Sequence, residues 1–296
     1  MKYIDEYRNK ELIRTLVNRI NCYSEREFVF MEVCGGHTNA IHRFGIPSLL
    51  PSNIKLKSGP GCPVCVTGIS YIDQAIEYAK MDDTIVCTYG DLIRVPGSFS
   101  TLYREKASGW DVRIVYSLLD ALKIAKDHPD QKVVFLAIGF ETTAPGSATA
   151  ILRAEQDKLD NFYLFSSHKL MPPAMNAIVE KGVKIDGYLC PGHVSTITGM
   201  QMYEQFAEQY GLACVISGFE PLDILQSIWM LLQQLEHQTP KVEIQYKRAV
   251  KPEGNLKARA IMDRVFEPRD DWWRGLGILS NSGLKVKPAY RKYDAE

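Results

Sequence analysis

Val133-Val134-Phe135-Leu136-Ala137-Ile138 is a continuous apolar stretch that runs directly into Gly139-Phe140-Glu141-Thr142-Thr143. A short run of this kind, rich in β-branched residues and closed by glycine, predicts a buried strand. Segments with helical periodicity, such as residues 69–80 and 117–126, lie between this run and others like it. Strands that alternate with helices predict βαβ units and a mainly parallel sheet. The other runs lie at residues 28–33, 54–57, 84–88, 112–116, 162–165, 187–189 and 212–216.

The predicted fold class is therefore α/β, with the strands either in two open sheets or in a single (β/α)8 barrel. The polar segment Asp127-His128-Pro129-Asp130 follows the fourth unit and marks a plausible boundary between two halves. We expect one domain over residues 1–127 and a second over residues 128–240. Residues 241–296 read as a trailing segment with a short helix around 256–265.

Composition narrows the class of protein. The chain has 296 residues, and 35 basic side chains balance 35 acidic ones. A net charge of zero argues against broad binding of nucleic acid or of anionic membranes. The first residues are too charged for a signal peptide, and no apolar run reaches the roughly 18 residues that span a membrane. Seven cysteines without a secretory signal favour cytoplasmic thiols for metal or redox chemistry over a disulfide framework.

Chemically reactive residues follow the predicted strands. In parallel α/β folds the carboxyl ends of strands carry the ligand sites, so we expect one clustered site there. Short βα turns by themselves would explain the glycines but not the cysteines and histidines. The segments are Cys34-Gly35-Gly36-His37-Thr38, Cys62-Pro63-Val64-Cys65, Tyr89-Gly90-Asp91, Ser166-Ser167-His168-Lys169, Cys190-Pro191-Gly192-His193 and Ser217-Gly218-Phe219-Glu220.

Cys62 and Cys65 form a CxxC pair that precedes the helix expected from residue 69. A helix N-terminus favours the thiolate, which is both a nucleophile and a soft metal ligand. Two such thiols can close a reversible disulfide or bind one metal ion. A structural zinc site would need a second pair, so a redox or transient-ligand role is favoured.

Cys34 stands alone at the end of its strand, with His37 three residues further on. A lone cysteine often acts as a small apolar residue, but its position at the expected site favours a metal or covalent role. Three interpretations of His37 remain open: a second metal ligand, a proton donor, or a structural histidine of the loop. His193 suits acid/base chemistry or hydrogen bonding to an anion.

Glu141, Thr142 and Thr143 offer a carboxylate and two hydroxyls before the next helix. If either threonine caps that helix, its free backbone amides form an anion site. Glu141 is alternatively a structural carboxylate that accepts backbone hydrogen bonds.

Six of these motifs, in this order along the chain, resemble the HypD family of hydrogenase maturation factors. The resemblance covers nearly the whole sequence, from about residue 25 to about residue 295. The motifs are Cys-Gly-Gly-His-Thr at 34–38, Gly-Pro-Gly-Cys-Pro-Val-Cys-Val-Thr at 59–67, Tyr-Gly-Asp-Leu-Ile-Arg-Val-Pro-Gly at 89–97, Gly-Phe-Glu-Thr-Thr-Ala-Pro at 139–145, Pro-Gly-His-Val-Ser at 191–195 and Trp-Arg-Gly-Leu-Gly at 273–277.

The resemblance implies a cytoplasmic scaffold on which the Fe(CN)2CO unit of [NiFe]-hydrogenase is assembled. It implies two partners, a small HypC-type chaperone and a HypE-type cyanide donor, and two similar α/β domains around a cleft. Cys34 would be the iron-ligating thiolate beside His37, and Cys62 and Cys65 the redox-active pair. The remaining cleft residues would be Asp91, Glu141, Thr142, Thr143 and His193.

Family members also continue into a cysteine-rich domain that binds a [4Fe–4S] cluster, whereas this sequence ends at Glu296 and offers no substitute set of four cysteines. An assembly scaffold, rather than an enzyme with turnover, is the leading interpretation. The alternatives are a metal-free thiol–disulfide oxidoreductase, a binding module with structural zinc, and an inactive or truncated homologue.

Overall fold

The structure is a computed structural model that describes residues 5–23 and 26–296, and it divides into two compact units. Unit 1 comprises Met1–Cys62 and Met175–Leu256, and unit 2 comprises Pro63–Ala174 and Lys257–Glu296. Each unit contains one open parallel sheet, which confirms the α/β class with two sheets and excludes the single barrel. Among the described residues, no helix is long and apolar enough to cross a lipid bilayer.

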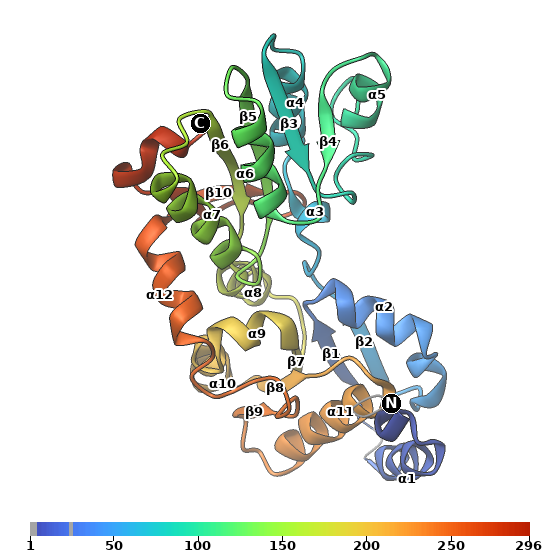
Figure 1. The fold of residues 1–296 in the computed structure, drawn as a ribbon. Coiled ribbons are helices and arrows are strands. Elements are labelled where there is room, and N and C mark those ends of the chain that lie inside the picture. The colour runs from blue at the N-terminus through green and yellow to red at the C-terminus, as the bar shows by residue number, and fades with distance from the viewer. Residues whose placement is uncertain (1–4, 24–25) are drawn as a thin grey trace. The chain divides into compact units, whose positions relative to one another are not determined.

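The sheet of unit 1 has the strand order β2-β1-β7-β8-β9, and all its strands run parallel. Its strands are β1 (Phe28–Glu32), β2 (Ile54–Ser58), β7 (Gly187–Pro191), β8 (Ala213–Ser217) and β9 (Val242–Ile244). Its helices are α1 (Lys10–Asn21), α2 (Gly35–Arg43), α9 (Gly192–Thr198), α10 (Glu204–Tyr210) and α11 (Pro221–Glu236). Strands β1 and β7, which are more than 150 residues apart in the sequence, thus lie side by side in one sheet (Figure 1).

Both faces of this sheet are covered. Successive residues of a strand point to opposite faces, so the buried residues of one strand pack on both sides. Phe30 and Val215 pack on one face with residues of α1, α2 and α11. Tyr188 lies on the other face, where its ring meets Phe206 of α10 at 5.5 Å. Burial on both sides explains why the strands read as continuous apolar runs in the sequence.

The sheet of unit 2 has the order β4-β3-β5-β6, again fully parallel. Its strands are β3 (Thr84–Thr88), β4 (Val112–Ile114), β5 (Lys132–Gly139) and β6 (Phe162–His168). The helices of this part of the chain are α3 (Pro63–Val66), α4 (Ile69–Ala79), α5 (Leu102–Ala107), α6 (Leu118–Asp127) and α7 (Ala144–Gln156), with α8 (Met171–Glu180) and α12 (Leu256–Val265) where the chain passes between the units.

The last part of the chain holds a feature that we did not expect. Residues 241–296 contain an antiparallel hairpin, β10 (Phe266–Trp273) with β11 (Gly277–Val286), in addition to the expected helix α12. The hairpin belongs to the core of unit 2, because Phe266 and Leu284 pack with Phe135 and Leu164 of its sheet.

The two units also differ from the contiguous domains expected over residues 1–127 and 128–240. Each unit is built from two separate stretches, since β7 returns to pair with β1 in unit 1. The chain passes between the units after residues 62, 174 and 256. The first passage falls inside the CxxC motif, so Cys62 belongs to unit 1 and Cys65 to unit 2.

Candidate functional site

Strand order places the candidate site residues of unit 1 between β1 and β7, where the direction in which successive strands are added to the sheet reverses. From β1 the chain proceeds to β2 on one side, and from β7 to β8 and β9 on the other. In open parallel sheets, ligands bind at such a switch point, beyond the carboxyl ends of the strands. Cys34 follows β1 at this edge, and His193 follows β7.

Cys34 is the N-cap residue of α2, with an extended backbone at φ −147° and ψ 120°. Its carbonyl accepts hydrogen bonds from the amides of His37 (2.8 Å) and Thr38 (3.1 Å). Its own amide donates to the buried carboxylate of Glu32 at 3.0 Å, and the Thr38 hydroxyl donates to the same carboxylate. Cys34 is therefore fixed on both sides of its backbone.

The sulfur of Cys34 lies in a low-dielectric environment. Burial raises the pKa of its thiol, while hydrogen bonds from the amides of Gly36 and His37 oppose that rise. The negative charge of Glu32 adds to the increase in pKa. The isolated protein thus favours the neutral thiol, and a bound metal cation would deprotonate it outright.

His37 is buried, with only 1% of its surface exposed. Its Nε2 lies 3.1 Å from the carbonyl oxygens of both Ser217 and Gly218. Burial lowers the pKa of His37 to about 4, so the imidazole is neutral at physiological pH. Its Nδ1 is buried and has no hydrogen-bond partner within residues 5–23 and 26–296.

His193 shares an aromatic stack with His37. The Phe219 ring lies 4.0 Å from the His193 ring and 4.6 Å from the His37 ring, centroid to centroid. Partial burial lowers the pKa of His193. The structure therefore brings Cys34, His37 and His193 together at one edge of one sheet, as the strand-end pattern predicted.

Both cysteines of the CxxC motif are at least partly accessible, and Cys65 is more exposed than Cys34. Cys62 is half-buried and lines an open cavity of about 610 Å³ along α2. Gly35, Thr38, Asn39, His42 and Arg43 line the rest of that cavity. Cys65 is exposed on the short helix α3. Accessible thiols of this kind can exchange electrons with a partner molecule.

Unit 2 holds the other predicted residues at its own switch point, between β3 and β5. Asp91 follows β3 and is exposed, and Thr142 follows β5 and is also exposed. Thr143 is the N-cap residue of α7, but its hydroxyl donates to the carbonyl of Phe140 at 3.2 Å. The helix start is thus where we expected it, although the hydroxyl bonds to Phe140 and not to the helix amides.

Glu141 is a buried carboxyl group with 3% exposure. One oxygen accepts the amide of Met171 at 2.9 Å, and the other has no partner among the residues that the structure describes. Burial raises the pKa of Glu141 to about 7, against two opposing backbone hydrogen bonds. Such a group can hold or release a proton near neutral pH.

Sequence reasoning missed four residues that shape the site of unit 1. Glu32 was hidden inside an apolar strand run, and Asp223 inside an amphipathic helix. The segment at the end of β8 is recognisable as a strand end, yet nothing in its sequence predicts that the Phe219 ring and the carbonyls of Ser217 and Gly218 contact His37. These four residues are Glu32, Ser217, Phe219 and Asp223.

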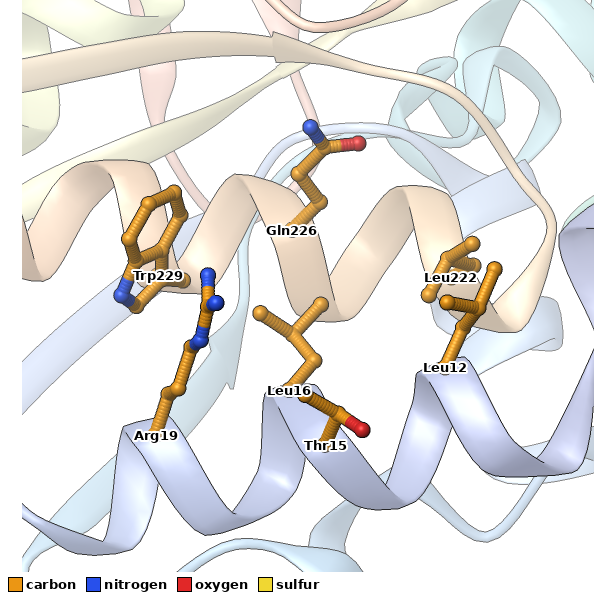
Figure 2. Close-up of a pocket in the computed structure, with 7 residues that line it drawn as sticks. All are labelled: Leu12, Thr15, Leu16, Arg19, Leu222, Gln226 and Trp229. Carbon is orange, nitrogen blue, oxygen red and sulfur yellow. The ribbon is translucent and has the colours of Figure 1, made fainter.

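A second cavity in unit 1 lies apart from the predicted residues. Helices α1 and α11 face each other across a groove of about 250 Å³ (Figure 2). Seven residues line it, with the Arg19 guanidinium 5.7 Å from the centre of the Trp229 ring. They are Leu12, Thr15, Leu16, Arg19, Leu222, Gln226 and Trp229. No predicted site residue belongs to this groove.

The sequence matches the family described as "HypD: Hydrogenase formation hypA family" over residues 11–296. It is 50% identical to hydrogenase maturation factor HypD2 of Bradyrhizobium diazoefficiens, with 100% of this chain and 81% of the relative covered. It is 48% identical to hydrogenase maturation factor HypD of Azotobacter vinelandii, at the same coverage. The HypD protein of Escherichia coli is 44% identical, with 100% and 82% covered.

Proposed function

This chain belongs to the HypD family and acts in hydrogenase maturation, and we propose that it is the scaffold on which the Fe(CN)2CO unit is assembled. The observation that carries the proposal is Cys34, a half-buried thiol at a helix start, beside a neutral histidine whose buried Nδ1 has no partner among the described residues. Thiolate and imidazole are ligands that suit iron with strong-field co-ligands.

In this proposal, Cys34 holds the iron of the cargo through its thiolate. The amides of Gly36 and His37, which already hydrogen-bond the sulfur, stabilise its negative charge once the proton leaves. Glu32 fixes the backbone so that the sulfur keeps one position. The chain therefore contributes a preorganised soft ligand and a polar backbone environment for the cyanide nitrogens.

Cys62 and Cys65 are proposed as a redox-active pair that cycles between dithiol and disulfide. Their accessibility supports this role, because Cys65 is exposed and Cys62 half-buried, and a partner must reach the thiols to exchange electrons. The proposed partners are a HypC-type chaperone and a HypE-type cyanide donor. In unit 2, Glu141 is proposed as a proton-holding group, and Asp91, Thr142 and Thr143 as polar residues that contribute to assembly.

The family's [4Fe–4S] cluster does not enter this proposal. Every proposed step therefore uses only residues of this chain.

Paired cysteine substitutions test the proposal against a metal-free thiol–disulfide oxidoreductase. We expect Cys34→Ser and Cys62→Ser each to abolish hydrogenase maturation in a strain that lacks its own copy of the gene. Cys22→Ser, at an exposed cysteine on the end of α1, is the control and should retain maturation. If Cys34→Ser matures hydrogenase normally while Cys62→Ser does not, the oxidoreductase is the better account.

A further inference from the structure

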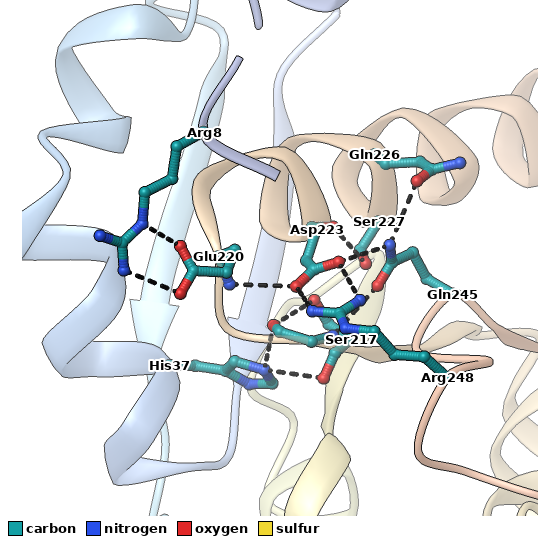
Figure 3. A network of polar contacts seen from close by, with 10 residues as sticks. Arg8, His37, Ser217, Glu220, Asp223, Gln226, Ser227, Gln245 and Arg248 are labelled. Atoms are coloured by element: carbon teal, nitrogen blue, oxygen red, sulfur yellow. Dashed lines mark hydrogen bonds and ion pairs between the residues drawn. The ribbon is translucent and has the colours of Figure 1, made fainter. Parts of the chain in front are cut away.

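Both polar contacts of the His37 ring fall on the same nitrogen. Its Nε2 lies 3.1 Å from the carbonyl oxygens of Ser217 and Gly218 (Figure 3). Carbonyl oxygens only accept hydrogen bonds, so Nε2 must carry the proton that it shares between them. A neutral imidazole has one N–H group, and Nδ1 is therefore left with an unprotonated lone pair.

The Nδ1 lone pair is the unusual feature of this histidine. It is buried and meets no hydrogen-bond donor in the described part of the chain. A buried acceptor without a partner is unfavourable, because it has given up its hydrogen bonds to water without replacing them. A hydrogen-bond donor or a metal ion that binds beside Nδ1 would supply the missing interaction.

The carbonyls that contact His37 belong to a segment, residues 217–220, which we name the 217–220 loop. A single carboxylate holds this loop at both ends (Figure 3). Asp223 accepts the Glu220 amide at 3.1 Å, and Gln245 bridges it to the Gly218 amide through contacts of 2.9 and 3.1 Å. Arg248 binds the same carboxylate with two nitrogens, at 2.8 and 2.5 Å.

The Asp223 carboxylate that holds the 217–220 loop is shielded from solvent. The Asp223 side chain has no exposed surface, and the Arg248 side chain is 18% exposed. A Cβ atom on Gly218 would approach Asp223 Cγ to 2.6 Å, so the carboxylate lies directly against the loop. Rigid, hydrogen-bonded surroundings of this kind keep a ligand side chain in one orientation.

The loop also contacts the flat face of the imidazole. Phe219 stacks between His37 and His193 at 4.6 and 4.0 Å. A Cβ atom added to Gly36 would lie 2.9 Å from the Phe219 ring, and one added to Gly192 would lie 3.2 Å from it. The ring therefore fills a slot that two glycines keep open, and it prevents the imidazole from tilting.

We propose that Asp223 and Phe219 are positioning residues that hold His37 as its Nε2-protonated tautomer and leave Nδ1 as an acceptor or ligand for the cargo bound at Cys34. The role toward the cargo rests on the proposed function, whereas the tautomer is a property of the chain alone. Releasing the 217–220 loop would move the two carbonyls and let the ring exchange its proton between nitrogens.

Nitrogen NMR of histidine-labelled protein without iron tests this directly. The chain has six histidines, so two-bond proton–nitrogen correlations are resolvable, and His37→Gln identifies the signals of interest. We expect wild-type His37 to show one protonated nitrogen, Nε2, and one unprotonated nitrogen, Nδ1. Asp223→Asn and Phe219→Leu should replace this pattern with averaged shifts.

A matched control is Asp186→Asn, at the amino end of β7 in the same sheet. Asp186 also pairs with an arginine, Arg26, at 3.0 Å and accepts a backbone amide, that of Val29, at 2.8 Å. Its loss should leave the His37 pattern unchanged. If Asp223→Asn fails to fold, Gln245→Ala frees the Gly218 amide while it keeps the buried ion pair, and it should give the same averaging.

Two results would overturn the proposal: wild-type His37 protonated on Nδ1, or a His37 pattern that survives both Asp223→Asn and Phe219→Leu. The readout needs no iron, so it decides the positioning role even if the wild-type protein never carries the Fe(CN)2CO unit. In protein that does carry the unit, both variants should hold several-fold less iron per chain than the Asp186→Asn control.

Discussion

Gly61 shows how closely a neighbouring backbone segment approaches Cys34. A Cβ atom on Gly61 would lie 2.5 Å from the Cα atom of Cys34 and 2.5 Å from the carbonyl carbon of Val33. The Gly35 amide also donates to the Gly61 carbonyl at 2.9 Å. Two segments that are distant in sequence thus meet here, and only glycine leaves enough space.

We therefore expect Gly61→Ala to displace Cys34 and lower the free energy of unfolding by about 1–3 kcal/mol. Denaturant unfolding measures the loss, and mass spectrometry after thiol labelling should show faster modification of Cys34. The control is Gly146→Ala in α7, where the nearest atom to the new Cβ lies 3.8 Å away. It should raise stability by about 0.5–1 kcal/mol, and a harmless Gly61→Ala would contradict the close approach.

Glu141 gives a prediction about pH. Its pKa is about 7 in the folded protein and near 4.5 when unfolded. Between these values the folded chain keeps a proton that the unfolded chain has lost, so the contribution of Glu141 to stability falls as pH rises. The total change is about 3 kcal/mol across this window.

Glu141→Gln should remove that slope, so that the variant gains stability relative to wild type between pH 4.5 and pH 7.5. Urea unfolding at a series of pH values measures the difference. Glu155→Gln, at an exposed position of α7, should follow the wild-type profile. A parallel profile for Glu141→Gln would show that the Glu141 carboxyl titrates normally.

At the scale of single elements, the structure explains which parts of the fold could be predicted. All eight expected strands are present, because burial on both faces of a parallel sheet leaves a continuous apolar run in the sequence. Strand β9 has only three residues, too few for a pattern. Between its two buried ends, strand β10 of the hairpin alternates half-buried and exposed residues, and its charged side chains concealed it.

The helix α2 was also missed, and with it the position of Cys34 at a helix start. Gly35 and Gly36 open this helix, although glycine disfavours helix interiors. Tertiary contacts outweigh that preference, since Gly36 must leave room for Phe219. The sequence could place Cys34, His37 and His193 at strand ends, but the contacts that orient them come from residues brought together only by folding.

Helix α11 depends on one buried ion pair at its start. Asp223 lies in its first turn and binds Arg248, which follows β9. Because removal of one partner leaves a buried charge unpaired, Asp223→Ala should lower the free energy of unfolding by about 3–5 kcal/mol.

The contrast for this prediction is Lys55→Ala, which breaks an exposed pair with Glu27 in the same unit. That pair has both side chains more than half exposed, and its loss should cost less than about 1 kcal/mol. Thermal and denaturant unfolding measure both variants. Equal losses for the two would contradict the importance of the buried pair.

At the scale of the whole molecule, the sequence predicted two parallel sheets but not which segments build them. The order of strands along the chain does not reveal that β7 pairs with β1. Only folding shows that each unit takes one early and one late segment. The CxxC motif consequently contributes Cys62 to one unit and Cys65 to the other, which no local pattern could indicate.

In the proposed function, both sheets contribute residues from their switch points. The proposed scaffold would use a soft ligand, a proton-holding group and accessible thiols, and the residues proposed for these roles all lie at or near strand ends. Unit 1 provides Cys34 and His37, and unit 2 provides Glu141. The proposed scaffold function depends most on the thiolate of Cys34.

Infrared spectroscopy of the purified protein, produced together with its HypC-type chaperone and the cyanide-donating proteins, tests that claim most directly. Wild-type protein should show cyanide and carbonyl stretching bands, and Cys22→Ser should retain them. Cys34→Ser should lose the bands while the protein remains folded. Their absence from wild type, where a HypD relative prepared alongside shows them, or their persistence in Cys34→Ser, would contradict the account.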